Sequence, residues 1–144
     1  MFGGRIDLSQ DLDGEPVVFA CFDLDEAEIA ASAHAVAVTV SERFRIASMS
    51  ADDVLELREL TVLADDLAEQ ARRHGIQTVV MRPARLSAYR DALARFVETR
   101  DEAGWMREED RDALACARGL LLPLEDLCGE ALRAALTPFG AVRR

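Results

Sequence analysis

The longest regular pattern in the chain lies between Ser50 and Gly75. Apolar residues recur there at spacings of three and four, the period of one face of an α-helix. This row consists of Leu57, Leu60, Ala64, Leu67 and Ala71, widened by Val54, Leu63 and Ala68. Ser50 and Asp53 have the spacing of a capping box, and Gly75 follows three basic residues as a stop signal. The pattern predicts a central helix of about 24 residues, roughly 36 Å long.

Two further apolar residues, Leu55 and Val62, fall on the opposite side of this helix, one heptad apart. A helix at the edge of a monomer is expected to be polar on its outer side. We therefore expect a second contact there. A further layer of the same chain is the favoured interpretation, and a second copy of the chain is the alternative.

The chain before this helix carries short patterns typical of strands. Arg5–Ser9 alternates, Val17–Phe22 is rich in β-branched and aromatic residues, and the turn signal 11–14 lies between them. These runs predict a β-hairpin. The Ala-rich residues 27–33 are compatible with one or two helical turns, and that question stays open.

Residues 35–46 fit two patterns. A helical row would contain Ile29, Ala33, Val36, Val40 and Phe44. A period of two instead collects Val36, Val38, Val40, Phe44 and Ile46. We favour a strand because alternation accommodates more of the apolar residues and β-branched residues suit strands. With the expected strand at residues 76–81, it would form a right-handed crossover if the two strands are parallel.

Helices are expected in the rest of the chain. Pro83 suits the first position of a helix that runs to about Ala103. The acids at 108–110 begin a third helix, and Pro123 either breaks it or opens a last one that ends near residues 137–138.

These elements predict the α+β class, with one domain over residues 1–144. We expect three to four short strands, mostly N-terminal, packed on the long central helix and a C-terminal group of about three helices. The strand-rich region covers residues 1–49, the helical region residues 50–138, and the frayed tail residues 139–144.

Composition points to a bacterial cytoplasmic protein. The chain has no lysine or asparagine, both of which have A-rich codons, so a GC-rich bacterial genome is expected. No apolar run approaches the roughly 18 residues of a membrane span, and the first residues lack the apolar core of a signal peptide. Cys21, Cys116 and Cys128 have no metal-binding spacing and are interpreted as reduced, small core residues.

Charge is distributed unevenly along the chain. The net charge is −10, which disfavours binding to nucleic acid or anionic membranes. Residues 70–90 contain five arginines and no acid, and they include the expected strand-to-helix junction at 81–85. A helix N-terminus with arginines is suited to anions. The candidate anion-binding residues are Arg82, Arg85, Arg90, Arg72 and Arg73. The favoured alternative is that they pair with the chain's own acids.

Other polar residues carry little chemistry in the sequence. His34 is placed before a strand and His74 at a helix end, and neither belongs to a catalytic motif. The acidic segment 23–28 is compatible with a divalent cation, but a solvated turn is favoured. Trp105 and Met106 lie in a bend between helices, where Trp105 either anchors a partner or, as we slightly favour, plugs the helix bundle.

The expected function is a non-enzymatic protein–protein interaction or regulatory module. Its interface candidates are Leu55, Val62, Trp105 and Met106, and a homodimer is one expected form. The alternative is a binder of, or enzyme for, a small phosphate- or carboxylate-bearing compound at the arginine cluster. No metal, cofactor, nucleic acid or membrane is expected as a partner.

Overall fold

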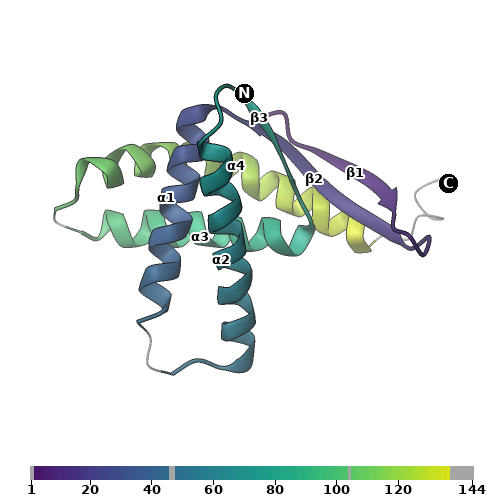
Figure 1. Ribbon diagram of the computed structural model, residues 1–144, viewed down its shortest axis with the longest axis horizontal. Coiled ribbons are helices and arrows are strands. Elements are labelled where there is room, and N and C mark those ends of the chain that lie inside the picture. The colour runs from purple at the N-terminus through teal and green to yellow at the C-terminus, as the bar shows by residue number, and fades with distance from the viewer. Residues whose placement is uncertain (1, 46–47, 104, 137–144) are drawn as a thin grey trace.

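The computed structural model describes residues 2–45, 48–103 and 105–136, and it confirms the α+β class. Three strands and four helices follow one another within these residues (Figure 1). In chain order they are β1 (Arg5–Gln10), β2 (Pro16–Leu24), α1 (Glu26–Arg43), α2 (Ala51–Ala71), β3 (Gln77–Met81), α3 (Pro83–Asp101) and α4 (Glu108–Leu136). No helix in these ranges is both long enough and apolar enough to cross a membrane.

The strands form an antiparallel sheet with β2 in the centre, in the order β1-β2-β3. The predicted hairpin between β1 and β2 is confirmed. In its turn, the Asp11 side chain accepts hydrogen bonds from the backbone N–H groups of Asp13 and Glu15, and Gly14 has a φ of +79°. One face of β2 carries the buried residues Ala20, Phe22 and Leu24 against the helices.

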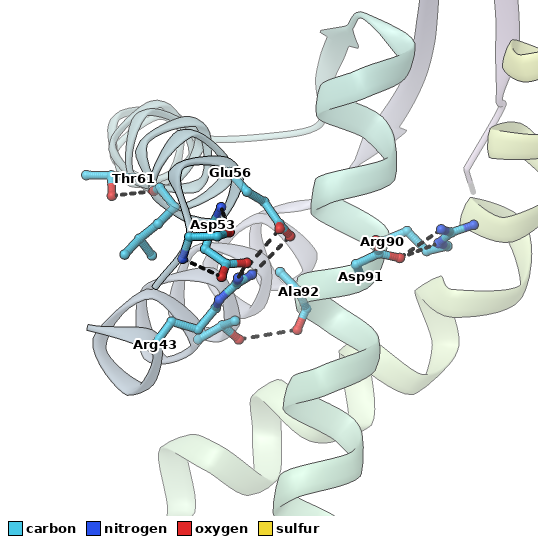
Figure 2. A network of polar contacts seen from close by, with 10 residues as sticks. Arg43, Asp53, Glu56, Thr61, Arg90, Asp91 and Ala92 are labelled. Atoms are coloured by element: carbon cyan, nitrogen blue, oxygen red, sulfur yellow. Dashed lines mark hydrogen bonds and ion pairs between the residues drawn. The ribbon is translucent and has the colours of Figure 1, made fainter. Parts of the chain in front are cut away.

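Between β2 and β3 the chain forms a hairpin of two helices, α1 and α2. They run side by side, and their ends nearest residues 44–50 extend beyond α3 and α4 (Figure 1). Arg43 of α1 joins them, because its guanidinium lies 3.0 Å from Glu56 and 3.7 Å from Asp53 of α2 (Figure 2).

The strand predicted at residues 35–46 is wrong, and so is the crossover built on it. Residues 35–43 belong to α1, residues 46 and 47 lie outside the described residues, and β3 pairs antiparallel with β2. The buried positions of α1 include adjacent pairs of opposite parity, Ala35 with Val36 and Thr39 with Val40. A strand would turn one member of each pair away from the core, whereas a helix buries both. The region predicted to be strand-rich, residues 1–49, is therefore largely helical from Glu26 onward.

The central helix α2 begins as predicted, with Ser50 and Asp53 in a reciprocal capping box. It has 21 residues and not about 24, because it ends at Ala71, before the three basic residues. Gly75, beyond its end, has a φ of +84°, which glycine adopts without strain. Leu57, Leu60, Leu63 and Leu67 are buried, but Leu55 and Val62 are 63% and 43% exposed. The expectation of a second layer of the same chain over these two residues is wrong, because α1 and α3 both contact α2 while leaving that side open.

Within the described residues, the C-terminal group contains two helices and not three. Pro83 begins α3, as predicted, but α4 continues through Pro123 to Leu136. Proline removes the hydrogen bond to the Gly119 carbonyl and would disfavour this path. Leu120, Leu124 and Leu127 are nevertheless buried on both sides of that position, so packing against α1 and α3 keeps one helix. The predicted end near residues 137–138 and the tail lie outside the described residues.

Two buried polar residues, Ser32 and Thr39, have hydrogen-bond partners. The hydroxyls of Ser32 and Tyr89 are 2.5 Å apart, and Thr39 donates to the backbone carbonyls of Ala35 and Ala92. Burial raises the pKa of Tyr89, and the hydrogen bond with Ser32 opposes this. These bonds hold α1 against α3, and they fix the segment of α1 that carries His34.

Candidate functional site

The five arginines of the predicted anion site do not gather in one place. Arg85 is held by α2, with its Nε 2.5 Å from Glu59 Oε1 and its Nη1 3.0 Å from Asp66 Oδ2. Arg90 pairs with Asp91 at 2.7 Å (Figure 2). The guanidiniums of Arg85 and Arg90 are thus occupied by carboxylates of the chain itself.

The other three arginines differ in their surroundings. Arg82 precedes the first turn of α3 and lies 5.7 Å from the centre of the Phe19 ring, on the sheet face that the helices leave open. Arg72 pairs with Glu69 at 3.2 Å. Arg73 has no ion pair with any described residue.

A hollow of about 260 Å³ lies beside the junction, and it contains Arg73 and Arg85. Asp66 and Glu69 line the same hollow, so its basic groups face acids. Anion binding at this junction stays a prediction, and the geometry brings together two of the five arginines.

A second cavity, of about 450 Å³, lies between α1, the end of α3 and the beginning of α4. Its apolar wall comes from Ala37, Val38, Trp105 and Met106, and its polar wall from Ser41 and charged side chains of three elements. The charged or titratable groups are His34, Glu42, Arg45, Arg100, Arg107, Glu109 and Asp110. No pattern in the sequence predicted this cavity.

Four of these side chains form one network. His34 Nε2 is 2.7 Å from Asp110 Oδ1, and Arg100 Nη1 is 3.5 Å from Asp110 Oδ2. Arg100 also donates to Glu42. The Asp110 carboxylate is 13% exposed, so most of its surroundings are protein. The network therefore joins α1, α3 and α4 along one wall of the cavity.

The aromatic ring of Phe96 supports this network from α3. It meets the His34 ring edge-on at 6.0 Å, and the Arg100 guanidinium lies 5.4 Å from its centre. Asp110 is in the first turn of α4, where the helix dipole favours a carboxylate. These contacts restrict the side chains to one arrangement, with polar atoms beside the cavity.

This cluster is not apparent from the sequence because its members are far apart in the chain. His34 and Asp110 are 76 residues apart. A helical interpretation of residues 26–43 would have placed His34, Val38 and Ser41 on one side, which is the signal that was available. His34 lies in the middle of α1, so its predicted position before a strand is wrong.

The arrangement does not form a nucleophilic triad. Ser41 lies seven residues after His34 on the same helix, which corresponds to a rise of about 10.5 Å. That is too far for a hydrogen bond between the two side chains, and His34 Nε2 is already bonded to Asp110. The network is suited to holding side chains in place and to hydrogen bonding with a ligand.

Trp105 lies at this cavity and is 75% exposed. The prediction that it plugs the helix bundle is wrong, because the hydrophobic core contains Phe96 and other buried residues but not Trp105. Met106 is half-buried and packs against the core. A role for either residue in binding a partner stays a prediction.

The acidic segment 23–28 serves the fold. Asp25 and Glu28 form the capping box of α1, and the Asp23 carboxylate accepts a hydrogen bond from Thr78. Among the described residues, no group of three or more His, Cys, Asp or Glu side chains is placed to hold a metal ion. The three cysteines are free thiols, and burial raises the pKa of each.

Comparison of the chain with family models, with curated proteins and with solved structures found no match in any of the three.

Proposed function

We propose that the protein is a non-enzymatic interaction module that binds a second copy of itself through the outer face of α2. The observation that carries this proposal is the exposure of Leu55 and Val62, 63% and 43%, on a helix that buries the four leucines of its other side. Residues seven apart lie almost above one another on a helix, so the pair forms the beginning of a helix–helix seam.

The charges around this seam support self-association. α2 contains seven acids and one arginine, which alone would make two copies repel. Arg43 of α1 and Arg85 of α3 neutralise four of these acids, namely Asp53, Glu56, Glu59 and Asp66. Arg72 pairs with Glu69. The neutralised flanks lower the electrostatic cost of bringing two α2 helices together.

The shape of the molecule supports the same face. The α1–α2 hairpin extends beyond α3 and α4, so α2 is accessible along much of its length (Figure 1). A two-fold arrangement would pair Leu55 of one copy with Val62 of the other, because a dimer of this symmetry uses the same patch on both subunits. The contact is small, so the dimer is expected to dissociate on dilution.

The test is light scattering over a concentration series. We expect a rise in mass with concentration for the wild type, and a monomer at every concentration for Leu55→Glu. The free energy of unfolding of Leu55→Glu should equal that of the wild type, because the Leu55 side chain is exposed. Leu122→Glu is the matched control, since Leu122 is 68% exposed on α4. A wild-type monomer throughout, or equal effects of the two substitutions, would contradict the proposal.

The small-anion alternative at the strand-to-helix junction has weaker support. The hollow beside Arg73 and Arg85 favours it, but the ion pairs of Arg85 with Glu59 and Asp66 compete with any added anion.

A further inference from the structure

The cavity between α1 and the start of α4 combines features that the dimer proposal does not use. Its volume of about 450 Å³ is within the range of roughly 300–1,000 Å³ typical of small-molecule sites. An apolar wall and a charged wall face the same space. We propose that this cavity binds a small aromatic carboxylate.

The apolar wall is suited to an aromatic ring. Trp105 is the only tryptophan of the chain, and it is exposed at the cavity although indole burial would be favourable. Ala37 and Val38 are small, and they line the same space as the half-buried Met106. A planar ring between these residues would bury the indole face without moving the backbone of α1.

The charged wall is suited to a carboxylate. Arg45 and Arg107 line the cavity, and neither has an ion pair with a carboxylate in the described ranges of the chain. Arginine guanidiniums bind carboxylates through two parallel hydrogen bonds. Arg85, Arg90 and Arg100, by contrast, already have acidic partners within the chain.

The acids of the cavity do not cancel these two arginines. Glu42 and Asp110 are engaged by Arg100, and Asp110 also by His34. Glu109 is the remaining carboxylate of the described lining, so two guanidiniums face one exposed acid. Arg100 Nε is also buried without a hydrogen-bond partner, the one such side-chain nitrogen or oxygen among the described residues. The network thus retains a donor that the chain does not satisfy.

The open face of the sheet is less suited to a carboxylate. The hollow there is larger, about 710 Å³, and Phe19 and Val80 line it. Its arginine, Arg5, lies 3.9 Å from Asp7, and Arg82 lies over the Phe19 ring. An anion at that site would displace a contact, whereas Arg45 and Arg107 have no such contact to lose within the described residues.

The test uses the fluorescence of Trp105, which reports on the cavity because no other tryptophan is present. Phenylacetate is the probe. Acetate is the control that has the carboxylate but no ring, and benzyl alcohol is the control that has the ring but no negative charge. We expect a saturable change of emission with phenylacetate, and affinities at least about tenfold weaker for the other two. Equal affinities for phenylacetate and acetate, or no saturable change with phenylacetate at millimolar concentrations, would overturn the proposal.

Two variants locate the binding. Arg107→Ala is expected to weaken phenylacetate at least about tenfold, because a charge-assisted hydrogen bond is lost. Arg111→Ala is the matched control, an exposed arginine one turn further along α4 and outside the cavity lining. Equal affinities of these two variants would overturn the assignment. Leu55→Glu should bind phenylacetate like the wild type, so the dimer proposal can fail or succeed separately.

Discussion

Arg85 and Arg100 each bridge two carboxylates, but in different surroundings. The partners of Arg85, Glu59 and Asp66, are both on α2 and are 44% and 59% exposed. The partners of Arg100, Glu42 and Asp110, belong to α1 and α4 and are 30% and 13% exposed. His34 extends only the second group.

The difference separates a surface ion-pair bridge, that of Arg85, from a partly buried network beside a cavity, that of Arg100. Water can replace Arg85 around its exposed partners, so the bridge contributes little to stability and offers little to a ligand. Around Arg100, side chains of three helices and the Phe96 ring leave the two carboxylates less exposed, and the network borders a cavity. An arginine cluster inferred from sequence spacing can be either kind, because the distinction depends on burial and on which helices supply the acids.

The largest effect is expected for Asp110→Ala. It removes the hydrogen bond to His34 and the ion pair with Arg100, and it leaves Arg100 with one carboxylate in a partly buried place. We expect a loss of about 2 kcal/mol in the free energy of unfolding, measured by urea denaturation. Asp112→Ala is the control, an exposed acid on the same helix. Equal losses for the two substitutions would show that the network of Asp110 contributes no more to stability than an exposed acid does.

A smaller effect is expected for Arg85→Ala. The bridge to Glu59 and Asp66 is solvent-accessible, so its removal should cost less than about 1 kcal/mol. In about 1 M salt, where the Debye length is about 3 Å, this cost should shrink further while that of Asp110→Ala persists. Arg95→Ala, an exposed arginine on α3, is the control in the same denaturation series. A larger loss for Arg85→Ala than for Asp110→Ala would reverse the comparison.

The smallest effect concerns the start of α2 and depends on pH. Hydrogen bonds from Ser50 lower the pKa of Asp53 below its ordinary 3.8. The ionised form is therefore favoured in the folded state, and its contribution is fully present above pH 3.8 and is lost as the pH falls through the lower folded-state pKa.

Asp53→Asn should therefore be less stable than the wild type at neutral pH, with the difference vanishing in acid. Thermal unfolding across this pH range measures it. Asp52→Asn is the control, because Asp52 is an exposed acid of the same turn outside the capping box. A difference that stays constant in acid would contradict the assigned role of Asp53.

Much of the fold could be predicted where local signals agree. The capping box of α2, Pro83 at the start of α3 and the turn at Gly14 act through neighbouring residues, so short stretches of sequence reveal them. Residues 35–43 were mispredicted because β-branched residues suggested a strand while tertiary burial selects a helix. Pro123 was misleading for a related reason, since burial of Leu120 and Leu124 holds α4 together.

Residue type and spacing within a few turns are sufficient to specify the helix caps, the turns, the two apolar sides of α2 and the strong acidity of the chain. Packing in three dimensions was needed to establish that Leu55 and Val62 stay uncovered, that Arg85 is neutralised by α2, and that His34 meets Asp110 beside a cavity. Contacts between helices far apart in the chain depend on how those helices cross, and neither composition nor period specifies that.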